Sequence, residues 1–208
     1  MQKNKFEVLH MPPTNTNSVL VVSGTDCVIF DAWGRADDWD RLLESRGLKL
    51  CAIYSTHGHG DHISAAPELA RRHNVPWFLK KEDVPLILWK REMLDFWKLS
   101  RIDDDFVKPN DLNIGKVKIL DDIDMEIIAA PGHSAGGVMF YFPEYRILLS
   151  GDTIFHDGVG RTDLPSGNDD ELRKTISLLI ARNLPDDTYV VHGHGTDSMM
   201  HDIKSNFH

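Results

Sequence analysis

Cysteine is scarce in this sequence, and the signals of secreted or membrane-spanning chains are missing. Only Cys27 and Cys51 occur, each inside an apolar run of the kind that forms a strand. Two cysteines cannot build the disulfide framework of a small secreted domain, so buried reduced thiols are favoured over a disulfide or a pair of ligands. No apolar segment of signal-peptide type follows residues 1–5, and no apolar run approaches membrane-spanning length. We therefore expect a cytoplasmic protein without a membrane partner.

Positive charge is also in short supply. The 208 residues include 23 lysines and arginines against 32 aspartates and glutamates, which gives a formal net charge of −9. This balance argues against nucleic acid or an anionic membrane as the main partner. No linker or low-complexity segment divides the chain, so we expect a single domain over residues 1–208.

Histidine, by contrast, is abundant, with 11 residues. Residues 57–62 read His-Gly-His-Gly-Asp-His and directly follow the apolar, strand-like run 50–55. Glycine between ligands allows unusual backbone angles, which bring several side chains around one point. Imidazole suits zinc, iron and similar ions, and an adjacent carboxylate suits the same ions or a second one. A solvated histidine-rich loop is the weaker alternative, since such a loop rarely falls at a strand end with this spacing.

Strand-like and helix-like segments alternate through both halves of the chain. The expected strands are 6–9, 19–23, 27–31, 50–55, 75–79, 125–130, 138–142, 147–150 and 188–191. The expected helices run from a cap at Asp37 or Asp38 to Gly47, from about 64 to 72, from a cap at Asn168 or Asp169 to about 180, and near the C-terminus. This order predicts two similar β/α layers packed sheet to sheet, with helices outside.

Three more ligand-type residues follow strands in the same way: His133, Asp152, and either His192 or His194. Five imidazoles and two carboxylates exceed the four positions of one tetrahedral zinc site, so two ions are implied. A carboxylate such as Asp152 can bridge two ions, and two ions a few ångströms apart can share a hydroxide. Glycines flank His194 on both sides and leave its backbone free to turn, whereas His192 continues a strand. We predict that His194 is the ligand.

These motifs resemble the metallo-β-lactamase superfamily of αββα hydrolases over essentially the whole chain. Residues 56–62, 130–134, 151–155, 160–165 and 193–195 are most similar to hydroxyacylglutathione hydrolase (glyoxalase II), especially its short bacterial members. The resemblance implies an α+β fold, namely an αββα sandwich of two mixed β-sheets with helices on the outer faces. It implies one ion held by His57, His59 and His133, a second held by Asp61, His62 and His194, and a bridging Asp152.

The resemblance also implies an activity. We expect hydrolysis of a small-molecule thioester of the S-lactoylglutathione type by a metal-bridging hydroxide, with Asp61 and Asp152 as catalytic carboxylates. The expected cofactors are two divalent metal ions per chain, zinc in the first place and iron or manganese otherwise. A pair of cations lowers the pKa of bound water to about 7. A thiol of pKa about 8.5 then leaves with little help from an acid.

Other functions fit the sequence less well. The main alternative is a persulfide dioxygenase, which shares this fold and much of the ligand set but uses one iron. Zinc-dependent β-lactamases usually lack an aspartate where Asp152 stands, and the acidic balance argues against a ribonuclease. A non-catalytic metal-binding protein is weaker still, because no ligand position is degraded. Longer glyoxalase II enzymes carry a C-terminal helical region for glutathione that we expect this chain to lack.

Residues outside the metal cluster give weaker signals. His156, Arg161 and Trp89 are candidate substrate contacts, although we favour a structural role for Arg161 and Asp163. Segment 84–99 has apolar residues on more than one helical face, which indicates a pocket wall, a lid or a homodimer contact as readily as a plain core helix.

Overall fold

A computed structural model describes residues 5–89 and 107–207, with side chains up to residue 87 in the first range. The first half of the chain forms a five-stranded sheet in the order β1-β2-β3-β4-β5. These strands are β1 (Phe6–Met11), β2 (Thr16–Ser23), β3 (Asp26–Phe30), β4 (Lys49–Tyr54) and β5 (Trp77–Phe78). The β1–β2 and β2–β3 pairs are antiparallel, whereas the β3–β4 and β4–β5 pairs are parallel.

The second half forms a six-stranded sheet in the order β13-β12-β9-β8-β7-β6. Its strands are β6 (Gly115–Leu120), β7 (Ile123–Ala129), β8 (Val138–Phe142), β9 (Ile147–Gly151), β12 (Tyr189–His192) and β13 (Ser198–Met199). β12 is parallel to β9 and the other neighbours are antiparallel, so this sheet is mixed as well. A separate hairpin pairs β10 (Ile154–Phe155) with β11 (Gly158–Val159).

The two sheets pack face to face, because alternate strand residues point to one side and are apolar. Val21 and Phe30 of the first sheet belong to the same buried cluster as Ile127 and Phe140 of the second. The rings of Phe30 and Phe140 meet edge to face with centroids 5.0 Å apart. This shared core fixes the distance between the strand ends of the two sheets.

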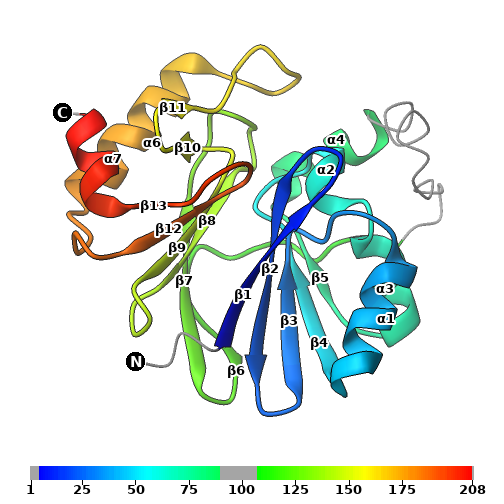
Figure 1. Ribbon diagram of the computed structural model, residues 1–208. Helices are drawn as coiled ribbons and strands as arrows, with labels where there is room; N and C mark the ends of the chain where they lie inside the picture. Colours follow the sequence, from blue (N-terminus) through cyan, green and yellow to red (C-terminus); the bar gives the residue numbers. More distant parts are fainter. Residues whose placement is uncertain (1–4, 90–106, 208) are drawn as a thin grey trace.

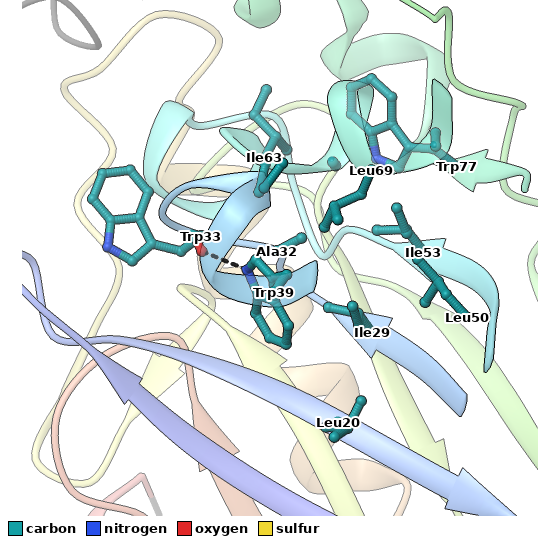
Figure 2. Packing of buried hydrophobic residues seen from close by; sticks show 14 of the residues in the cluster. Leu20, Ile29, Ala32, Trp33, Trp39, Leu50, Ile53, Ile63, Leu69 and Trp77 are labelled. Atoms are coloured by element: carbon teal, nitrogen blue, oxygen red, sulfur yellow. Dashed lines mark hydrogen bonds between the residues drawn. The ribbon is translucent and has the colours of Figure 1, made fainter. Parts of the chain in front are cut away.

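Helices cover the outer face of each sheet (Figure 1). α1 (Ala36–Arg46) and α3 (Ala66–His73) pack on the first sheet, where Trp39 donates its indole N–H to the Trp33 carbonyl at 2.8 Å (Figure 2). α6 (Asp169–Ala181) and α7 (Met200–Asn206) pack on the second sheet. The predicted helix–sheet–sheet–helix sandwich is therefore confirmed. No helix among residues 5–89 and 107–207 is long and apolar enough to cross a membrane.

Three local predictions need correction. α1 is capped by Arg35, which makes no side-chain capping bond, whereas Asp37 and Asp38 lie in the first turn, where negative charge suits the helix dipole. The helix expected over 64–72 begins only at Ala66, because residues 60–63 form the separate short helix α2 (Gly60–Ile63). Strand β6 was not predicted: it lies at a sheet edge, and its lysines alternate with only partly buried apolar residues, which weakens the apolar signal.

Segment 84–99 is described only in part. The 3₁₀ turn η2 (Lys81–Asp83) leads into α4 (Val84–Trp89), and Leu86 and Ile87 of this helix are buried. The remainder of the segment and the side chain of Trp89 lie outside the described residues. The expected pocket, lid or dimer role of 84–99 therefore stays a prediction.

Candidate metal centre

The sequence-predicted ligands come from four strand ends that meet at one edge of the sandwich. β4 leads into residues 57–62, and the second sheet contributes the residues that follow β7, β9 and β12. These three strands of the second sheet run in the same direction, because β7 and β9 are both antiparallel to β8 and β12 is parallel to β9. Their carboxyl ends consequently lie at one edge, which brings His133, Asp152 and His194 together.

All seven predicted ligand residues fall into three overlapping groups, and within each group the ligand atoms lie within 4.8 Å of one another. The groups are His57, His59 and His133; His57, His62 and Asp152; and Asp61, His62 and His194. The first and third groups are the two trios that the resemblance implied. The middle group places Asp152 between them.

Asp152 faces both trios. Its Oδ2 lies 3.5 Å from Nε2 of His133 and 3.4 Å from Nε2 of His194, and its Oδ1 lies 3.4 Å from Nε2 of His62. Asp61 approaches His194, with 3.3 Å between Oδ2 and Nε2. One carboxylate thus reaches both trios, as a bridging ligand requires.

The donors fit divalent cations. Nε2 of His57 and Oδ1 of Asp152 are buried and lack a hydrogen-bond partner. Elsewhere in the cluster imidazole nitrogens face each other, 2.8 Å apart between His133 and His59 and 3.3 Å apart between His62 and His194. Buried polar atoms normally have partners, so unpartnered donor atoms that converge on one point indicate a site for positive charge. Imidazole and carboxylate donors suit zinc, iron and manganese.

Gly193 leaves room for the side chains of Asp152 and His62. A Cβ atom at this position would lie 1.9 Å from Oδ1 of Asp152 and 3.0 Å from Cε1 of His62. No larger residue fits without displacing the carboxylate, which explains one glycine of the predicted 193–195 motif.

Hydrogen bonds to Nδ1 orient several ligands. Nδ1 of His62 donates to Asp31 at 2.9 Å, that of His133 to the Arg161 carbonyl at 2.7 Å, and that of His194 to the Thr14 carbonyl at 3.0 Å. A proton held on Nδ1 leaves Nε2 with its lone pair toward the centre of the cluster. The sequence interpretation missed Asp31 and Thr14 as orienting residues. Asp31 did carry a signal, since it is a carboxylate at the end of a predicted strand, like the ligands themselves.

Burial and neighbouring charges shift the pKa values of the donors. Burial lowers the pKa of His57 well below its ordinary value, and the charge of His62 acts in the same direction. Burial would also lower the pKa of His62, but Asp31 and Asp152 outweigh it and raise that pKa well above the ordinary value. The pKa of Asp152 lies well below its usual range, because His62 and His194 outweigh the effect of burial. His57 is therefore neutral and Asp152 ionised at neutral pH.

The two histidines of the last motif have different surroundings. His192 is buried, its Nδ1 lies 2.6 Å from the Ile154 carbonyl, and its Nε2 lies 2.8 Å from the Ser198 hydroxyl. Neither nitrogen belongs to a described ligand group. His194, by contrast, lies in the group with Asp61 and His62, and its role as a metal ligand stays a prediction.

The candidate substrate residues His156 and Arg161 lie in different surroundings. His156 lines a cavity of ≈ 540 Å³ beside His194, together with Phe155, Asp157, Gly158, Thr196 and Asp197. The guanidinium of Arg161 forms two hydrogen bonds with Asp163, at 2.7 and 2.6 Å, and both side chains are exposed. The Arg161 carbonyl also contacts Nδ1 of His133, and whether Arg161 contacts a substrate or has a structural role stays a prediction.

Comparison with known proteins matches residues 11–194 to the metallo-beta-lactamase superfamily. A Bacillus subtilis (strain 168) protein named "Probable metallo-hydrolase YqgX" is 30% identical over 200 residues, which cover 93% of this chain and 92% of that protein. "Hydroxyacylglutathione hydrolase GloC" of Haemophilus influenzae is 33% identical over 175 residues, with 82% of this chain and 81% of that protein covered. The crystal structure of TTHA1623 in a di-iron-bound form superposes with a TM-score of 0.81 at 30% identity, covering 94% of this chain and 95% of that one.

Proposed function

The chain belongs to the metallo-beta-lactamase superfamily, and we propose that it is a dinuclear metal-dependent hydrolase of thioesters. The observation that carries the proposal is the presence of both complete trios with Asp152 between them. His57, His59 and His133 would hold one ion, Asp61, His62 and His194 the other, and Asp152 would bridge. When bound, such ions supply a water of lowered pKa as nucleophile and stabilise charge on the substrate carbonyl.

The protein's own residues contribute position and charge. Asp61 and Asp152 place two ionised carboxylates opposite the imidazoles. Burial alone would raise the pKa of Asp61, but the hydrogen bond with His194 and the charges of His62 and His194 together outweigh burial and lower this pKa to about 2. Burial of His57, His59 and His62 restricts water to the open side near His194. A thioester suits this arrangement, because a thiolate with a conjugate acid of pKa about 8.5 leaves without a general acid.

We propose a substrate of the S-lactoylglutathione type, supported by the name of the Haemophilus influenzae relative. Its thiol portion would occupy the cavity beside His194, in contact with His156. Zinc is the first metal expected, and the di-iron form of TTHA1623 supports iron as the next candidate.

The test combines metal content with reaction type. Metal analysis of the purified protein should find about two ions per chain, and S-lactoylglutathione should release free thiol without oxygen consumption. Glutathione persulfide serves as the control substrate in an oxygen electrode. Oxygen uptake with the persulfide, intact thioesters and about one iron per chain would show that the protein is the dioxygenase and not the hydrolase.

A further inference from the structure

Asp83 lies between the two loops that carry the first trio, although its part of the sequence holds no ligand motif. It ends η2, immediately before α4, and its residue surface is 0% exposed. Its Oδ2 accepts the backbone N–H of Gly58 at 2.9 Å and the hydroxyl of Ser134 at 2.6 Å. Its Oδ1 accepts the backbone N–H of Gly136 at 2.6 Å. One buried carboxylate thus receives three donors from two segments far apart in the sequence.

Two of these three donors are direct neighbours of candidate ligands in the sequence. Gly58 stands between His57 and His59, and Ser134 follows His133. A Cβ atom on Gly58 would lie 2.6 Å from the backbone oxygen of Asp83, so the 57–59 loop rests directly on this residue. The carboxylate therefore sets how far His57 and His59 lie from His133.

We propose that Asp83 is a positioning residue for the first metal position, which rests on the metal binding proposed above. It belongs to no ligand group and acts by holding two ligand loops in register. The second trio is oriented by other groups, since His62 is held by Asp31 and His194 by the Thr14 carbonyl. Loss of Asp83 should consequently weaken one ion and spare the other.

Asparagine at this position tests the carboxylate with almost no change in shape. An amide offers one acceptor oxygen and one NH₂ donor, whereas Gly58 and Gly136 both present N–H groups to opposite oxygens. In either amide orientation one N–H faces another donor, so one loop must shift. Removing an orienting partner typically lowers metal affinity about 10- to 100-fold.

The experiment measures each position alone by zinc titration of the apoprotein against a chelating indicator. The His194→Ala background reports the first position and the His133→Ala background the second. Asp83→Asn should weaken zinc binding about 10- to 100-fold in the first background and change it less than about threefold in the second. Asp111→Asn is the matched control, because Asp111 accepts the Lys81 backbone N–H at the start of the same turn. This control should leave both affinities unchanged.

A merely structural role predicts a different result. Equal weakening in both backgrounds, or a lower melting temperature with unchanged affinities, would overturn the proposal. Should Asp83→Asn fail to fold, Ser134→Ala removes a single hydrogen bond and should weaken the first position alone, about two- to tenfold. If the unmutated protein binds none of zinc, iron and manganese, the proposed function itself is wrong, which separates the two failures.

Discussion

The carboxylate of Asp31 lies 2.9 Å from Nδ1 of His62, and both side chains are buried. The same carboxylate accepts the N–H and the hydroxyl of Thr56, each at 2.7 Å. Asp31 thereby ties the end of β3 to both ends of the 56–62 ligand loop. A residue outside the ligand set therefore holds the ligand loop in place through hydrogen bonds.

This arrangement predicts that Asp31→Asn weakens metal binding most at the trio that contains His62. The expected loss is about 10- to 100-fold, because an amide can hold Nδ1–H through its oxygen only by presenting NH₂ to the Thr56 donor. Zinc titration in the His133→Ala background measures it. The surface substitution Asp187→Asn, whose carboxylate pairs only with Arg146 among the described contacts, serves as control. Unchanged affinity in Asp31→Asn would rule out this orienting role.

Much of the centre could be predicted from sequence because its ligands follow strands. A ligand motif at a strand end is a local pattern, and four such ends in one sequence are a stronger signal of a metal site than any one alone. Asp31 and Asp83 could not be assigned in this way. Their partners lie 25 to 53 residues away in the chain. The pairing of β3 with β4 brings Asp31 to Thr56, and the packing of both sheets brings Asp83 to Gly136.

The elements of the fold also differ in how well the sequence predicts them. The hairpin of 138–142 with 147–150 was predicted because turn residues and apolar runs lie next to each other in the sequence. Edge strand β6 gave no comparable signal, because exposed lysines alternate with residues that are mostly only partly buried. Strands β10, β11 and β13 have two residues each, which is too short for a pattern. Short elements of this kind depend on neighbours supplied by the rest of the fold.

The cysteines should differ in reactivity. Burial raises the pKa of the Cys27 thiol to about 12, whereas Cys51 is half-buried. The Cys27 thiol therefore stays protonated at pH 8, and its burial also keeps reagents away. Iodoacetamide should therefore label Cys51 first and Cys27 only after unfolding, as mass spectrometry of the native protein can determine. Early labelling of Cys27 would contradict its burial.

Substitutions of His192 and of His194 should differ in their effect on the metal content of the protein. His194→Ala should lose the second ion and most activity, because His194 faces Asp61 and His62. His192→Ala should keep both ions but lose about 1–3 kcal/mol of unfolding free energy, since buried partners such as Ser198 are left unpaired. Metal analysis and urea unfolding of both variants distinguish the two roles, and loss of metal from His192→Ala alone would reverse the assignment.

Gly193, which packs against the carboxylate of Asp152, gives the strictest test of Asp152 as a bridging ligand. Gly193→Ala places a methyl group 1.9 Å from Oδ1 of Asp152, well inside the distance at which atoms can coexist. Since Asp152 faces both trios, its displacement should weaken both ions together, unlike the one-sided effect expected of Asp83. Gly158→Ala is the matched control, because it lies in the neighbouring cavity wall and a Cβ there meets nothing within 4 Å. Zinc titration should show both affinities reduced at least tenfold in Gly193→Ala and unchanged in Gly158→Ala. Full metal content and activity in Gly193→Ala would mean that Asp152 does not bridge the two positions.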